Sequence, residues 1–97
     1  MPTSDALKSE EKIFEALDSK LNKVHYYKDI YEDYMIIQVA YKGNNRVLLE
    51  VWIDWADKLF CSVDVEYSDI EPLLDCDGIP TEEDLKKLVD KLNKLLS

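Results

Sequence analysis

The chain has 97 residues and a formal net charge of −9 at pH 7, with 46% hydrophobic and 34% charged residues. This length accommodates one domain and excludes a second, so residues 1–97 are expected to fold as a single domain. The acidic balance argues against direct binding to nucleic acid or to an anionic membrane surface.

The negative charge is concentrated in the second half of the chain. Residues 47–84 contain twelve carboxylates and a single base, Lys58. The opening residues carry scattered charges without an apolar signal segment, and no apolar run approaches the roughly 20 residues of a spanning helix. We therefore expect a cytoplasmic protein with reduced cysteines.

Residues 4–22 are predicted to form an amphipathic helix with Ser4 or Asp5 as its N-cap. Its apolar positions follow helical spacing and are Leu7, Ile13, Phe14, Leu17 and Leu21. Residues 24–34 contain four tyrosines among small charges without a regular period. We interpret this stretch as an ordered connection.

From residue 34 to residue 67 the hydrophobic period changes to two, which predicts three antiparallel strands at 34–42, 46–53 and 59–67. The Gly-Asn-Asn loop at 43–45 is expected to supply the positive φ of a tight hairpin. Pairing Lys42 with Arg46 then sets apolar residues opposite one another along a whole face.

A second turn at residues 54–58 is predicted to bring Ile53 opposite Leu59. A register shifted by two residues keeps the same faces but sets Glu50 directly against Asp64. Because like charges directly opposite each other destabilise a sheet, the first register is preferred.

Residues 68–80 contain two prolines and a glycine among acids and are predicted to form a loop, with a helical turn near 69–74. The final helix is expected to begin after Thr81 as N-cap, with Asp84 completing a capping box. Its apolar stripe consists of Leu85, Leu88, Val89, Leu92, Leu95 and Leu96. The predicted fold is α+β, a two-layer α-β-β-β-α arrangement in which both helices pack on one face of a three-stranded antiparallel meander.

The opposite sheet face is expected to combine apolar and acidic side chains. Alternation sends to it Ile36, Gln38, Ala40, Leu48, Glu50, Trp52, Phe60, Ser62, Asp64 and Glu66. In the preferred register Ile36, Trp52 and Phe60 lie in one row, which is typical of an interaction hot spot. The alternative is that Tyr27, Tyr31, Trp55 or the 68–80 loop folds over this patch and covers it.

The spacing of the acids suggests one kind of partner. Asp64 and Glu66, at positions i and i+2 of a strand, are separated by roughly 6.8 Å. A nucleic-acid strand presents its phosphates at comparable intervals, so such a row fits a basic groove built for a backbone.

No residue pattern indicates catalysis, a metal or a cofactor. The run Asp75-Cys76-Asp77-Gly78 is similar to the start of a calcium loop, but its glycine comes too early, and we interpret it as a turn. The only histidine, His25, excludes a metal site with several imidazoles. Cys76 with His25 could form a nucleophilic dyad, and two carboxylates could act as the acid and base of a glycosidase. Both arrangements need a substrate cleft, and a small two-layer fold offers little concave surface.

The sequence therefore favours a non-enzymatic acidic binding protein, without metal or cofactor, that occludes a basic site on a protein partner. This is the mode of inhibitor, immunity and anti-defence proteins, and the basic site is one suited to nucleic acid. The predicted contact residues are Glu50, Trp52, Asp54, Trp55, Asp57, Phe60, Asp64 and Glu66. The alternative is a self-associating or chaperone-like module, including a homodimer, that uses the exposed sheet face around Trp52.

Overall fold

A computed structural model describes residues 1–18 and 24–97. These residues form two helices and one five-stranded antiparallel sheet with the strand order β1-β2-β3-β4-β5. The helices are α1 (Ser4–Leu17) and α2 (Glu82–Leu96), and the strands are β1 (Val24–Ile30), β2 (Tyr34–Lys42), β3 (Arg46–Asp54), β4 (Phe60–Val65) and β5 (Leu74–Asp77). The α+β class is confirmed, whereas the prediction of a three-stranded meander is wrong because a strand is added at each edge.

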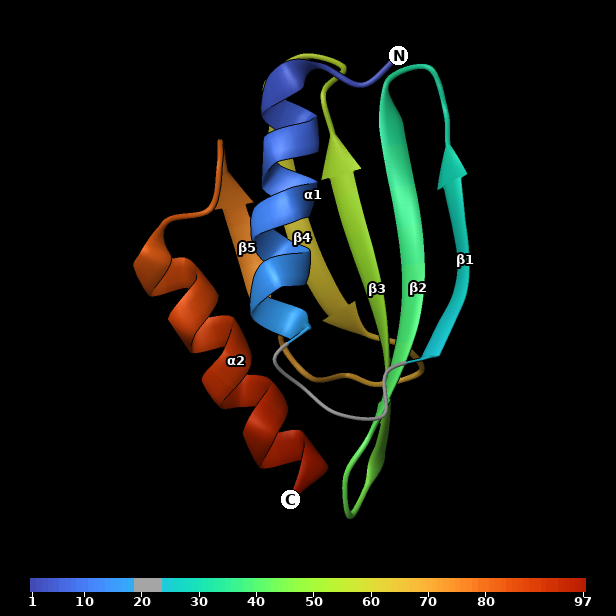
Figure 1. Ribbon diagram of the computed structural model, residues 1–97, viewed down its shortest axis with the longest axis vertical. Coiled ribbons are helices and arrows are strands. Elements are labelled where there is room, and N and C mark those ends of the chain that lie inside the picture. Colours follow the sequence, from blue (N-terminus) through green and yellow to red (C-terminus); the bar gives the residue numbers. More distant parts are fainter. Residues whose placement is uncertain (19–23) are drawn as a thin grey trace.

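Both helices lie on one face of the sheet (Figure 1), and the core fills the space between the two layers. The side chains at its centre, all fully buried, include Ile13, Leu17, Met35, Leu49, Ile53, Leu88 and Leu92. β1 lies beyond the edge of α1 (Figure 1), and Lys28 on this strand reaches back to pair with Glu10 of α1. Among the described residues, no helix covers the opposite face of the sheet (Figure 1).

The start of α1 is capped by a threonine side chain. In α1 the N-cap is Thr3, whose side chain accepts a hydrogen bond from the Ala6 N–H, rather than Ser4 or Asp5. The end of the predicted first helix, residues 19–22, lies outside the described residues. Neither described helix is long and apolar enough to cross a membrane.

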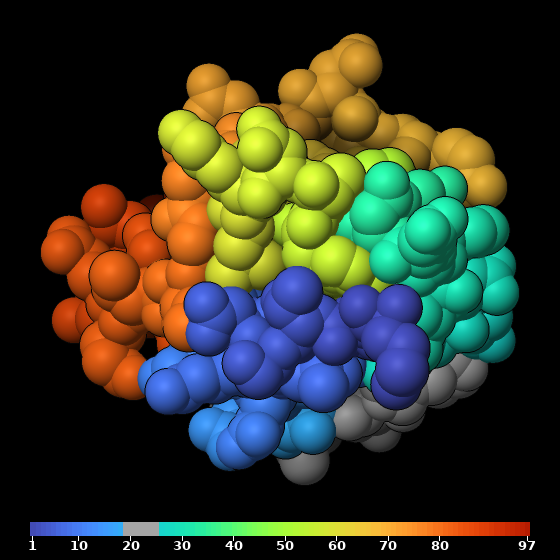
Figure 2. All heavy atoms as spheres, turned by 90° about the horizontal axis from the view of Figure 1, so that it is seen from above, coloured from blue at the N-terminus to red at the C-terminus, as the bar shows by residue number. Residues whose placement is uncertain are grey.

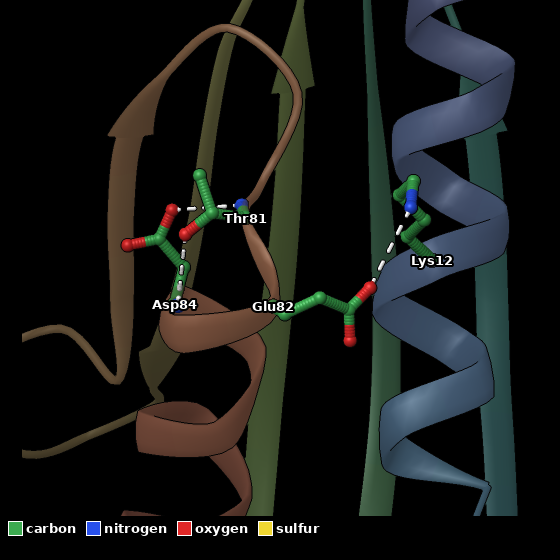
Figure 3. A network of polar contacts seen from close by, with 4 residues as sticks. All are labelled: Lys12, Thr81, Glu82 and Asp84. Carbon is green, nitrogen blue, oxygen red and sulfur yellow. Dashed lines mark hydrogen bonds and ion pairs between the residues drawn. The ribbon is translucent and has the colours of Figure 1, made fainter.

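The capping box of α2 is confirmed. The Asp84 N–H donates to Thr81 Oγ1 at 3.1 Å and the Thr81 N–H donates to Asp84 Oδ2 at 2.9 Å (Figure 3). These hydrogen bonds hold the pKa of the Asp84 carboxyl below its usual value. Beside them Glu82 Oε1 lies 3.8 Å from Lys12 Nζ of α1 (Figure 3), and because the Glu82 side chain is 92% exposed, this pair contributes little stability.

The β2–β3 hairpin has the predicted register, from Lys42 opposite Arg46 to Met35 opposite Ile53. The predicted role of its glycine is wrong, because no residue of the 43–45 loop has a positive φ. Gly43 instead lies against the end of α2, where an added Cβ would stand 2.6 Å from Leu96 O.

The predicted β3–β4 register is wrong by two residues. Glu50 lies opposite Asp64, Trp52 opposite Ser62 and Ile53 opposite Cys61. The wide indole therefore faces a small hydroxyl side chain instead of a second aromatic ring. The β3–β4 turn is held by hydrogen bonds to the β1–β2 turn. The Trp55 N–H donates to Asp33 O at 2.8 Å, and Trp55 Nε1 donates to Glu32 O at 3.1 Å.

The two edge strands lie where the sequence predicts a connection and a loop. In β1 all residues from 26 to 30 are exposed, so the strand shows no apolar alternation, and its pairing with β2 is irregular between His25 and Tyr27. β5 is short and pairs with β4 from Leu74 opposite Val63 to Asp77 opposite Phe60. Residues 69–73 form no helical turn and run to β5 as irregular chain.

Candidate protein-interaction surface

The sheet face turned away from the helices is called the outer face here. Strand register arranges its side chains in rows that cross the sheet. One row contains Asp29, Ile36, Trp52, Ser62 and Asp75, and the next contains Tyr27, Gln38, Glu50 and Asp64. Figure 2 shows that the segment after β4, in gold, stands out on the side of the molecule opposite α1, in blue.

Three aromatic rings form a stack on the outer face. The ring centroids of Tyr31 and Tyr34 are 4.6 Å apart and those of Tyr34 and Trp52 are 4.7 Å apart, with interplanar angles of 20° and 14°. The stack runs from the β1–β2 turn to the central strand. Because Tyr34 and Trp52 stay half-buried and Tyr31 is exposed, these rings cover only part of the face. They offer a rigid apolar area to a partner.

A carboxylate cluster lies beside this stack. It consists of Glu50 on β3, Asp64 on β4 and Glu66 directly after β4, all partly buried. Gln38 Nε2 donates a hydrogen bond to Glu66 Oε1. The second oxygen, Glu66 Oε2, is shielded from solvent and has no donor when both glutamates are ionised.

The pKa of Glu50 is raised, first by burial, then by a hydrogen bond to Glu66 and by the charges of Glu66 and Asp64. A proton on Glu50 supplies the donor that Glu66 Oε2 lacks. Protonation of Glu50 would also remove the like-charge repulsion on which the sequence-based argument against this register rests. The charges of Glu50 and Glu66 reach Tyr27 on β1, whose pKa is raised mainly by desolvation and the charge of Asp29.

The structure brings together six of the eight predicted contact residues. By alternation and register these share the outer face: Glu50, Trp52, Asp54, Phe60, Asp64 and Glu66. Trp55 instead packs half-buried against the core, and Asp57 is exposed in the β3–β4 turn. The predicted row of Ile36, Trp52 and Phe60 is wrong, because Ser62 takes the place of Phe60.

The sequence-based prediction did not include Tyr34 among the outer-face residues, and it considered Tyr27 and Tyr31 only as possible covers of the patch, because 24–34 was interpreted as a connection. Tyr34 and Tyr31 form two thirds of the aromatic stack, and Tyr27 borders the carboxylate cluster. The tyrosine density of this segment was the available signal, since aromatic residues are enriched in strands.

The two cysteines face each other across β4 and β5. Both thiols donate weakly to Gly78 O, at 3.9 Å from Cys61 and 3.7 Å from Cys76. Burial, with the neighbouring Cys61 and three aspartates, raises the pKa of the Cys76 thiol to about 12. At neutral pH this thiol is protonated and is therefore a poor nucleophile.

No metal-binding arrangement is found in the described part of the chain, where no three His, Cys, Asp or Glu side chains group around a common point. Gly78 has a φ of 81° and terminates β5 in a turn before α2. The side chain of His25 lies outside the described residues, so the expectation that His25 and Cys76 form no catalytic pair stays a prediction.

Comparison of the chain with protein-family models, curated proteins and solved structures finds no match among any of them.

Proposed function

We propose that this protein is a non-enzymatic binding protein whose outer face occupies a basic site on a protein partner, as inhibitor and immunity proteins do. The observation that carries the proposal is the meeting of a stacked aromatic area with a carboxylate cluster on the sheet face that has no helical cover. Aromatic anchors supply contact area, and surrounding acids supply steering and orientation.

The cluster suits cationic groups in particular. A guanidinium or ammonium group that approaches Glu50 and Glu66 supplies positive charge and a hydrogen-bond donor for the unpartnered Glu66 Oε2. Asp64 and Asp75 continue the acidic surface along neighbouring rows. Binding of a cationic group is then accompanied by proton release from Glu50, so it grows stronger as pH rises through the raised pKa of this carboxyl.

We propose further that the partner's basic site is one that accommodates a nucleic-acid backbone. Asp64 on β4 and Glu66 directly after this strand are two residues apart, which corresponds to roughly 6.8 Å in extended chain. A basic groove that binds phosphates at similar intervals is occluded by such a row.

Self-association through the same face is disfavoured by charge. An isologous dimer about Trp52 brings two acidic faces together, and like charges in a desolvated interface cost several kcal/mol. A basic partner meets no such repulsion. A complex with a basic protein partner is therefore favoured over a homodimer through this face.

The test begins with affinity capture from the native host and identification of the partner by mass spectrometry. Surface plasmon resonance then measures association at 50 and 500 mM salt for the wild type, for Trp52→Ala and for the double variant Asp64→Lys with Glu66→Lys. We expect the association rate to fall at least tenfold with salt and the double variant to lose binding.

The matched control is Glu11→Lys with Asp90→Lys, which makes the same charge change at exposed helical positions. It is expected to retain at least a third of the wild-type affinity. Equal loss in the control and the outer-face variant, or association that ignores salt, would refute a specific role for the outer face.

A further inference from the structure

A groove lies between the C-terminal half of α2 and the segment that joins β4 to β5, apart from the residues of the outer face. Its volume is about 380 Å³, and it is lined by Ile70, Glu71, Leu73, Lys91, Lys94 and Leu95. This volume is within the range of small-molecule sites, roughly 300–1,000 Å³. Figure 1 shows the two elements that form its walls.

The floor of the groove is apolar and held in place. Leu73 is 3% exposed, and its N–H donates to Val63 O of β4 at 2.7 Å, which ties this wall to the sheet. Leu95 of α2 packs partly buried against the core. Ile70, by contrast, is 47% exposed, so a large apolar side chain at the edge is available to a ligand.

The rim of the groove is cationic, which is unusual in so acidic a chain. Lys91 and Lys94 are three residues apart on α2, are exposed, and form no ion pair with any described residue. Lys12, Lys28 and Lys87 do form such pairs elsewhere. Glu71 is the one carboxylate in the lining, so the groove carries a net positive charge.

An apolar floor below two ammonium groups matches a ligand with an apolar body and a single anionic head. Since one net positive charge balances one negative charge, a monocarboxylate fits better than a doubly charged phosphate. The carboxylates of the outer face repel such an anionic ligand only weakly at physiological salt, because their electrostatic field is screened over about 8 Å. We propose that this groove binds an amphipathic monocarboxylate, such as a fatty acid of medium length.

The test uses the full chain and a series of hexanoate, octanoate and decanoate, each below its micelle concentration, followed by ¹H–¹⁵N chemical shifts. We expect shifts at residues 70–73 and 91–95, with affinity rising about fourfold per added methylene. Decylammonium, of equal length and opposite charge, is expected to leave these residues unchanged. If it shifts them equally, or if the carboxylates shift the outer face instead, the proposal is wrong.

Variants test the two parts of the groove separately. Lys91→Gln with Lys94→Gln is expected to weaken decanoate binding about three- to tenfold, whereas the control Lys8→Gln with Lys86→Gln changes it less than twofold. Glu71→Gln is expected to strengthen binding about twofold, and Ile70→Ser to weaken it. All these side chains are exposed, so the variants fold, which the ¹H–¹⁵N spectrum itself verifies. Unchanged affinity in the Lys91 and Lys94 variant would overturn the proposal.

Discussion

The surroundings of Glu50 link its pKa to the stability of the fold. It lies opposite Asp64, next to Glu66, on a sheet face that is partly shielded from water. Its pKa is raised, so between the unfolded value of 4.5 and the higher folded value the native state holds more protons than the unfolded chain. This group therefore favours folding most below its unfolded pKa, and that contribution is lost as pH rises through the folded pKa.

Glu50→Gln, which imitates the protonated carboxyl, is expected to raise the unfolding free energy at pH 7 by about 0.5–1 kcal/mol, because it removes charges facing each other across strands. Urea unfolding from pH 4 to pH 8 measures this difference, which is expected to shrink toward pH 4. The exposed Glu11→Gln is the control and should change stability by less than about 0.5 kcal/mol. A destabilised Glu50→Gln protein at pH 7 would contradict the repulsion between Glu50 and its neighbouring carboxylates.

At the scale of elements, the β2–β3 hairpin closes the C-terminal end of α2. The Asn44 and Asn45 N–H groups donate to Leu96 O at 2.7 and 3.1 Å, and Asn45 Nδ2 donates to Ser97 O at 2.8 Å. Terminal helix carbonyls have no partner within their helix, so these hydrogen bonds satisfy them. The approach leaves no room for a side chain at Gly43.

Gly43→Ala is therefore expected to destabilise the protein by about 1–3 kcal/mol, since the methyl group would displace the α2 terminus from the hairpin. Urea unfolding measures the loss, and hydrogen exchange should show faster exchange at the Asn44 and Asn45 amides. Asn44→Ala keeps the backbone donor and serves as the control, with a change below about 0.5 kcal/mol. A Gly43→Ala protein as stable as this control would show that the contact is unimportant.

Across the whole molecule, charge is separated between surfaces. The outer face and the turns at its ends carry most of the carboxylates of residues 47–84, whereas the exposed side of α2 carries lysines. The described ion pairs are few and lie at the surface, so they offset little of the net charge of −9. Repulsion among the acids is then the dominant long-range term.

Added salt is therefore expected to stabilise the protein, with a Tm about 4 °C higher in 300 mM than in 10 mM sodium chloride at pH 7, which corresponds to roughly 0.5–1 kcal/mol. Differential scanning calorimetry measures the shift. In the double variant Asp64→Lys with Glu66→Lys the increment should be at most half as large. A Tm that falls with salt would mean that attractive pairs outweigh the repulsion.

Short-range patterns in the sequence determined α2 and the β2–β3 hairpin. The capping box of Thr81 and Asp84, the leucine stripe and the pairing of Lys42 with Arg46 depend on residues close along the chain, and all three are found in the structure. The identity of the outer-face residues on β2 to β4 also followed from alternation, because a shift of two residues leaves each side chain on its own face.

Only the tertiary structure decided the rest. β1 has exposed side chains on both faces, so no hydrophobic period marked it, and its pairing with β2 places Tyr27 and Asp29 on the outer face. The β3–β4 register places Glu50 opposite Asp64 on a partly buried face, where burial and neighbouring carboxylates raise the pKa of Glu50, and these surroundings cannot be read from residue types alone. The 380 Å³ groove joins α2 to a segment 20 residues away in the chain, and such contacts form only when the helix packs on the sheet.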